Sequence, residues 1–169
     1  MVRQDQDYSV QAADPDVMVD WSNIEQVHLR VASDDLTSCP ICLFPPTAAK
    51  MSECGHVFCW SCILHYLALS DDDSRPCPIC HQPITKPGLR SVKIISKHSY
   101  NTGECVKMTL MKRERNSLFA VPVNNSFITK HPDINNSDVV QEYVKLFTAS
   151  PDQIKTEILD VERSELEKQ

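Results

Sequence analysis

The spacing of apolar residues predicts short strands before residue 39 and a helix after residue 59. Apolar and polar residues alternate at 17–21 and again at 27–31, a pattern typical of strands. From 60 to 69 the apolar residues recur at helical spacing, which predicts a helix of about three turns. Residues 1–16 are polar and acidic without periodicity, so we expect a disordered tail there and strands within 17–38.

Strand-like alternation returns beyond residue 82. Val92 and Ile94 alternate with polar neighbours, and a second alternation involves Val106, Met108 and Leu110. A polar turn follows at 113–116, and an apolar run at 118–123 comes after it. Two strands joined by such a turn form a β-hairpin, so we expect 82–136 to be a β region.

Helix signals dominate from residue 137 to the end of the chain. Ser137 can cap a helix that extends to Phe147. The sequence Ser-Pro-Asp-Gln at 150–153 combines an N-cap serine, a helix-starting proline and a capping-box glutamine. The residues expected on one face of the final helix are Ile154, Ile158 and Val161. We therefore expect helices over 137–169.

Seven of the eight cysteines and one histidine follow a regular order. That order is Cys39-x2-Cys42-x11-Cys54-x-His56-x2-Cys59-x2-Cys62-x14-Cys77-x2-Cys80. A Cys-x2-Cys pair places two thiolates on one tight turn, close enough to occupy two corners of a tetrahedral zinc site. Eight such ligands imply two structural zinc ions. Only about a quarter of the chain lies between the first and last ligand, and a hydrophobic core that small needs an additional stabilising element.

A disulfide framework is the alternative to zinc, because an even count of eight cysteines would suffice for it. Two features favour zinc. The N-terminus lacks a basic-then-apolar signal sequence, so we expect a reducing compartment, where disulfides are rare. A histidine in phase with the Cys pairs also has no part in a disulfide. Redox chemistry is less favoured, because three Cys-x2-Cys pairs in one short stretch fit a metal module better.

Composition and charge narrow the class of protein further. The chain has 169 residues, a net charge of -6, and three glycines against eleven prolines, which favours turns and extended connectors over flexible linkers. No stretch approaches the roughly 20 apolar residues of a membrane span, so we expect a soluble, intracellular protein without a membrane partner. Cys105, the remaining thiol, lies at the start of a strand pattern without an acid–base motif, and we expect no catalytic role for it.

The segment 86–115 is basic within this acidic chain. It holds eight Lys or Arg residues against two Glu, a local balance of about +6. Contact with RNA is one interpretation, and a solvated hairpin face is the other. Direct nucleic-acid binding by the metal module itself is disfavoured by the acidic balance and the lack of a basic recognition helix.

One residue separates Cys54 from His56, whereas two residues separate the cysteines of each neighbouring pair. This spacing is expected for half of a metal site whose other two ligands are distant in the sequence. This ligand order resembles the RING finger, with three cysteines, one histidine and four cysteines. A PHD finger has four cysteines before its histidine and is disfavoured. The resemblance implies a small zinc-stabilised α+β fold over 39–81 with a cross-brace. Cys39, Cys42, Cys59 and Cys62 would hold one Zn2+, and Cys54, His56, Cys77 and Cys80 the other.

RING fingers mostly serve in ubiquitin ligases, so the resemblance implies a ubiquitin-loaded conjugating enzyme and ubiquitin as partners, and no catalytic nucleophile in this chain. In the family, three side chains contact the conjugating enzyme, and Ile41, Tyr66 and Pro78 occupy their positions. His81 occupies the linchpin position, where many active members carry Arg or Lys. Histidine is shorter and mostly uncharged at neutral pH, which reduces charge assistance. The alternative is therefore a non-enzymatic zinc scaffold.

The likeness extends beyond the metal ligands. Segments from Val19-Asp20-Trp21 through Cys62-Ile63-Leu64 to Leu110-Met111-Lys112 resemble one group of larger RING proteins, over roughly 17–123. That group monoubiquitylates proteins of the small (40S) ribosomal subunit when ribosomes stall. The resemblance implies the same substrates here, and it makes ribosomal RNA a candidate contact for the basic segment 86–115. It also implies a cytoplasmic protein that can enter the nucleus.

Overall fold

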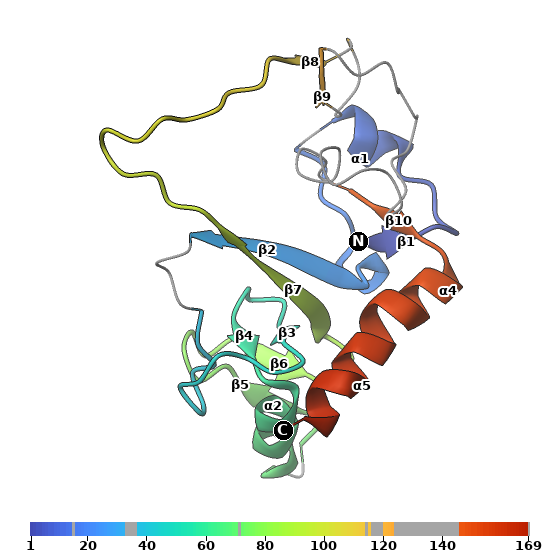
Figure 1. Ribbon diagram of the computed structural model, residues 1–169. Helices are drawn as coiled ribbons and strands as arrows, with labels where there is room; N and C mark the ends of the chain where they lie inside the picture. The colour runs from blue at the N-terminus through green and yellow to red at the C-terminus, as the bar shows by residue number, and fades with distance from the viewer. Residues whose placement is uncertain are drawn as a thin grey trace.

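A four-stranded sheet joins the segments before, within and after the metal-binding stretch. The computed structural model describes residues 1–14, 16–32, 37–70, 72–113, 115, 120–123 and 146–168. In the sheet, β2 (Gln26–Ala32) runs parallel to β7 (Arg90–Lys97), and β7 pairs antiparallel with β3 (Lys50–Met51). The fourth strand, β4 (Val57–Phe58), pairs with β3. The fold is mixed α+β (Figure 1).

Three two-stranded sheets surround the larger one. β5 (Ser74–Pro76) pairs with β6 (Pro83–Thr85), and β8 (Met111–Arg113) pairs with β9 (Ala120–Pro122). β1 (Val2–Arg3) pairs in parallel with β10 (Thr148–Ala149), which brings together segments more than 140 residues apart. The β1–β10 pair therefore places the first residues beside the segment that precedes the C-terminal helix.

The predicted helix after residue 59 is confirmed as α2 (Trp60–Ala68), and Ile63 and Leu67 are its buried residues. A short α1 (Ser9–Ala13) and a 3-10 turn η1 (Trp21–Asn23) lie before β2. The C-terminal helix is continuous, from α4 (Pro151–Ile154) through a π-helical turn η2 (Lys155–Leu159) to α5 (Asp160–Glu167). It crosses the molecule from β10 toward α2 (Figure 1). None of the helices in the described ranges is both long and apolar enough to cross a bilayer.

The first residues of the chain depart from the expected disorder. The Val2 N–H donates to the Phe147 carbonyl at 2.7 Å, and the Val2 side chain is 1% exposed. Met1, Phe147 and Ile158 form a buried cluster. The polar composition of 1–16 does not reveal this arrangement, because the few apolar residues of the segment pack against residues that are distant in sequence.

Of the two strands expected before residue 39, only the second is present. The 27–31 alternation lies in β2, whereas 17–21 contains no strand and ends in η1. The Asp20 carboxylate accepts the backbone N–H of Ser22 at 2.8 Å. This local cap satisfies backbone groups that a strand would otherwise pair, so it competes with the extended conformation.

The hairpin and the terminal helices are confirmed in part. β8 and β9 form the hairpin. The apolar residues just before it lie outside any strand and are exposed, namely Val106, Met108 and Leu110. The capping box at Ser150 and Gln153 is present. The final helix buries Ile158 but leaves Val161 47% exposed, because the π-helical turn shifts the phase of the residues that follow it. Of the helix expected over 137–147, residues 137–145 lie outside the described ranges.

Candidate metal centre

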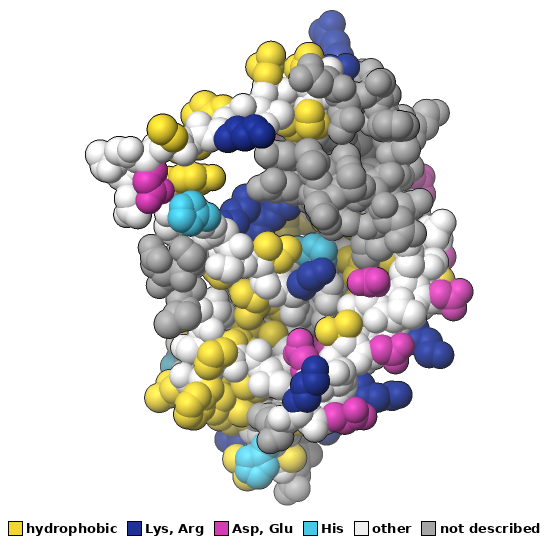
Figure 2. Space-filling model, viewed as in Figure 1, with side chains coloured by type: hydrophobic (Ala, Val, Ile, Leu, Met, Phe, Trp, Pro, Cys, Tyr) yellow, Lys and Arg dark blue, Asp and Glu magenta, His cyan; other side chains and the backbone are white. Residues whose placement is uncertain are grey.

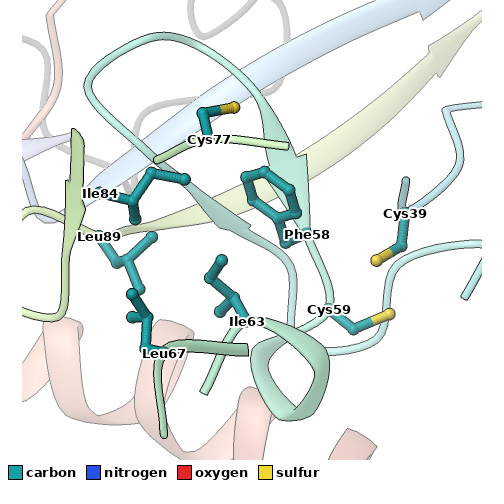
Figure 3. Close-up of a cluster of buried hydrophobic side chains, with 8 residues drawn as sticks. All are labelled: Cys39, Phe58, Cys59, Ile63, Leu67, Cys77, Ile84 and Leu89. Atoms are coloured by element: carbon teal, nitrogen blue, oxygen red, sulfur yellow. The ribbon is translucent and has the colours of Figure 1, made fainter. Parts of the chain in front are cut away.

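The core of the metal-binding stretch is small and includes three of the ligand cysteines. Phe58, Ile63 and Ile84 face one another between β4, α2 and β6 (Figure 3). The remaining members of the cluster are Leu67, Leu89, Cys39, Cys59 and Cys77. The ligands are therefore part of the core, and the apolar packing and the metal geometry depend on each other.

The first site joins a tight turn to the start of a helix. Cys39 and Cys42 come from the turn, and Cys59 and Cys62 come from the N-cap and first turn of α2. The four Sγ atoms lie within 4.8 Å of one another, and Cys42 Sγ lies 3.6 Å from Cys59 Sγ. Tetrahedral zinc with bonds of about 2.3 Å separates thiolates by about 3.8 Å, so the four residues fit the ion.

The second site combines Cys54, His56, Cys77 and Cys80, whose ligand atoms also lie within 4.8 Å of one another. The imidazole Nδ1 of His56 is 3.4 Å from Cys54 Sγ and 3.5 Å from Cys77 Sγ, so it presents Nδ1 as the ligand atom. Tetrahedral zinc separates a thiolate from an imidazole nitrogen by about 3.6 Å. All eight cysteines are free thiols, which excludes the disulfide alternative.

The raised pKa values of two thiols in the first site show how unfavourable four thiolates are there without a bound cation. Burial, followed by the neighbouring Cys42 and the Cys39 thiolate, raises the pKa of Cys62 to about 12. Burial, opposed by the N–H of Thr47 and reinforced by the thiols of the site, raises the pKa of Cys59 to about 11. Four thiolates this close repel one another, and a divalent ion removes that repulsion and ionises the coordinating thiols.

Cys54 differs from the thiols of the first site. Burial would raise its pKa, but hydrogen bonds from Ser52 and His56 outweigh burial and lower the pKa to about 6. The hydroxyl Oγ of Ser52 lies 3.0 Å from Cys54 Sγ. This thiol is therefore ready to bind a metal ion at neutral pH.

Each site is gathered from two separated pairs, and the two sets interleave along the chain. Residues 39–80 match the family described as zinc finger, C3HC4 type (RING finger). Residues 39–80 form a RING finger. The cross-brace assignment of all eight ligands and of two zinc ions is confirmed.

Two relatives share this part of the chain. An uncharacterized RING finger protein of Schizosaccharomyces pombe is 47% identical over 62 residues, which are 36% of this chain and 9% of the relative. E3 ubiquitin-protein ligase MAG2 of Saccharomyces cerevisiae is 39% identical over 66 residues, 38% of this chain and 9% of the relative. The match therefore spans less than a tenth of the length of each of these proteins.

The two Cys-x2-Cys turns of the RING that begin at Cys39 and Cys77 share one backbone geometry. In the first, the Leu43 N–H donates to the Cys39 carbonyl at 2.8 Å, and in the second, the His81 N–H donates to the Cys77 carbonyl at 2.9 Å. Leu43 has φ 64° and His81 has φ 62°, both left-handed. Neither residue is glycine, so each turn holds a side chain in a conformation that costs about 1–2 kcal/mol. The linchpin position thus has a structural counterpart in the other turn.

The residues predicted to contact a conjugating enzyme lie at or near the surface of the RING. Ile41 is 39% exposed, Pro78 is exposed, and Tyr66 is half-buried. The Tyr66 hydroxyl donates to the Pro76 carbonyl at 2.7 Å, and the guanidinium of Arg75 stacks on the Tyr66 ring at 4.2 Å. Sequence reasoning missed Arg75, whose only signal is its place two residues before a ligand.

Further apolar side chains surround these positions. Leu43 is 76% exposed, Phe44 71% and Ile79 50%. Apolar side chains gather on the surface over this part of the molecule (Figure 2). Cys105, in contrast, is exposed and lies outside both ligand sets.

Proposed function

We propose that this RING finger recruits a ubiquitin-loaded conjugating enzyme and acts as the ligase module of a RING-type E3 ubiquitin transferase. The observation that carries the proposal is the surface of Ile41, Tyr66 and Pro78 next to two complete zinc sites. The RING match and the relative named an E3 ubiquitin-protein ligase support it. Exposed apolar residues on rigid turns suit a modest interface in which a few side chains supply most of the binding free energy.

In this function the chain supplies no nucleophile. The lysine amine of the substrate attacks the thioester carbonyl of the conjugate, and the cysteine thiolate of the conjugating enzyme leaves. The RING contributes by orienting the conjugate, since holding reactants in a reactive geometry lowers the barrier. His81 would donate a hydrogen bond from the linchpin position, without the fixed charge of Arg or Lys.

The test is ubiquitin discharge from a panel of loaded conjugating enzymes by the purified chain, with and without Ile41→Ala. Loss of that side chain should cost about 1–3 kcal/mol of binding, and so slow discharge at least several-fold, while zinc content stays at two per chain. Met108→Ala is the matched control, because Met108 is an 88% exposed apolar residue outside the RING. Equal rates for Ile41→Ala and the unchanged chain would contradict the docking assignment.

A zinc scaffold that binds partners without promoting transfer is the second candidate. His81 favours it, because the linchpin position lacks a permanent charge. A chain that binds conjugating enzymes but accelerates discharge with none of them would support the scaffold.

At finer detail, we propose that the chain belongs to the group of RING finger protein 10, modifies 40S ribosomal proteins, and works in the cytoplasm with access to the nucleus. The resemblance over roughly 17–123 supports this proposal, and the basic 86–115 segment offers a contact for ribosomal RNA. The test is ribosome co-sedimentation over a salt series, because phosphate contacts weaken steeply with salt. A flat salt response, or no effect of replacing Lys107, Lys112 and Arg113 by Gln, would count against the RNA contact.

A further inference from the structure

The C-terminal helix contacts the RING at a segment that supports its first zinc site. The backbone N–H of Ala48 donates to Glu165 Oε2 at 2.8 Å, across 117 residues of sequence. Two residues further on, Lys50 Nζ lies 2.7 Å and 2.8 Å from the two carboxylate oxygens of Glu162. The contact joins α5 to the stretch that leads into β3, as the neighbouring positions of these elements in Figure 1 show.

The Lys50–Glu162 contact is enclosed, and the Ala48–Glu165 hydrogen bond is partly buried although Glu165 itself is an exposed residue. The Lys50 and Glu162 side chains are only 13% and 15% exposed. Lys50 Nζ also lies 5.0 Å from the ring centroid of Trp60, the first residue of α2. An ion pair shielded from water is screened less than a surface pair, and removing one partner leaves the other charge poorly solvated.

 Ala48 is 1% exposed and has φ 44°, a left-handed conformation that is unfavourable for a residue with a Cβ. A buried N–H without an acceptor costs about 1–3 kcal/mol. Glu165 supplies that acceptor, so it stabilises the backbone at this strained position.

The same stretch touches the first zinc site directly. The Thr47 N–H donates to Cys59 Sγ at 3.4 Å, and the Thr47 carbonyl accepts the Trp60 N–H at 3.2 Å. An N–H donor to a ligating thiolate orients the sulfur and disperses its charge. Glu165 binds the residue next to Thr47, and Lys50 holds the far end of the stretch.

We propose that Glu165 and Glu162 are positioning residues of the first zinc site, through which the C-terminal helix sets how firmly that site retains its metal. They act through residues 47–50 rather than by touching the ion. The second site has no such contact with α5 among the described residues, and its ligand Cys80 is exposed. This proposal does not depend on ligase activity.

The test uses the full chain loaded with Co2+, because the visible absorption of a four-thiolate site differs from that of a three-thiolate, one-imidazole site. A chelator is added, and metal loss from each site is followed separately. Glu165→Ala should release metal from the first site about tenfold faster, as expected for loss of outer support to a ligand, and Glu162→Ala should act in the same direction. The second site should lose metal at the rate of the unchanged chain until the first has emptied.

Asp160→Asn is the control, because it removes one negative charge from the same helix at a residue that is exposed and lies outside these contacts. Its release rates should match those of the unchanged chain. Hydrogen exchange in the zinc-loaded protein gives a second readout, in which the Ala48 amide should lose protection in Glu165→Ala. Unchanged release from the first site, or equal acceleration at both sites, would overturn the proposal, since the latter indicates a general loss of stability.

Discussion

The RING and the regions that flank it are stabilised in different ways. The RING gathers eight ligands within 42 residues (39–80), and three of the ligands belong to its core. The flanking cluster instead joins Met1 to Phe147, Ala149 and Ile158, with no metal ligand in it. Metal coordination allows a short segment to fold around few apolar residues, whereas the flank depends on contacts between the two ends of the chain. The two regions meet in the sheet that β3 and β7 share and at the Lys50–Glu162 pair.

Removing a ligand should have the largest effect and should separate the two regions. Cys39→Ser or His56→Ala deletes one of four ligands, and each structural zinc site contributes on the order of 10–16 kcal/mol of apparent binding free energy. Because the cross-brace interleaves the two sites, we expect both zinc ions to be lost and 39–80 to unfold. Zinc per chain by mass spectrometry and amide NMR spectra would show this.

The same spectra test the comparison itself. If the flank depends on packing alone, the amides of Val2 and Phe147 should keep their folded positions in Cys39→Ser. Their collapse together with the RING would show instead that the shared sheet makes one cooperative unit. Normal zinc content in either ligand variant would contradict the metal assignment.

A cavity in the flank is the converse experiment. Ile158 is 3% exposed within the flanking cluster, so Ile158→Ala should lower the free energy of unfolding by about 2–5 kcal/mol. Zinc content should remain two per chain, because the substitution touches no ligand. Denaturant unfolding measures the first quantity and metal analysis the second. Val161→Ala, at a 47% exposed position on the same helix, should change stability little.

This difference between the regions also explains what the sequence could predict. The ligand sets, the helix after Cys59 and the capping box at Ser150 depend on residues a few positions apart, or on a spacing specific to one family. Pairing of β1 with β10 depends on two short segments at opposite ends of the chain, and no local pattern marks it. The expectation of a disordered tail was incorrect for that reason.

Contacts of the candidate site follow the same division. The eight ligands were predictable, whereas the Glu165–Ala48 hydrogen bond and the stacking of Arg75 on Tyr66 were not. Each of these depends on a side-chain direction that only the folded chain defines. The apolar alternation at 106–110 is the opposite case, because a local pattern was present but misleading. It predicted a strand, whereas these residues are exposed and lie outside any strand.

Substitution of Arg75 tests whether the metal ions alone fix the proposed docking surface of the RING. The Arg75 guanidinium stacks on Tyr66 and donates to the Tyr66 carbonyl at 2.8 Å. Arg75→Met should weaken binding of a conjugating enzyme about two- to fivefold, since a cation–π contact contributes about 0.5–1 kcal/mol at an exposed site. Zinc content should not change. Calorimetric titration gives the affinity, and a double-mutant cycle with Tyr66→Ala gives the coupling between the two residues. Additive effects in that cycle would show that Arg75 does not act through Tyr66.

Acidification provides the finest probe, because it reaches a group that belongs to the flank alone. Burial, followed by nearby positive charges, lowers the pKa of His28 from 6.5 to about 4. Its ring lies 5.4 Å from that of Phe147, beside the flanking cluster. Between pH 6.5 and about 4 the unfolded chain binds a proton that the folded chain does not bind. The contribution of His28 to stability is therefore present above pH 6.5 and is lost as the pH falls.

His28→Gln should flatten the pH dependence of the free energy of unfolding in that window. It should not alter zinc release, which responds to acid through the thiolates. Denaturant unfolding at several pH values, run in parallel with metal analysis, separates the two. If both proteins show the same pH dependence, His28 is not a source of the acid sensitivity of the molecule.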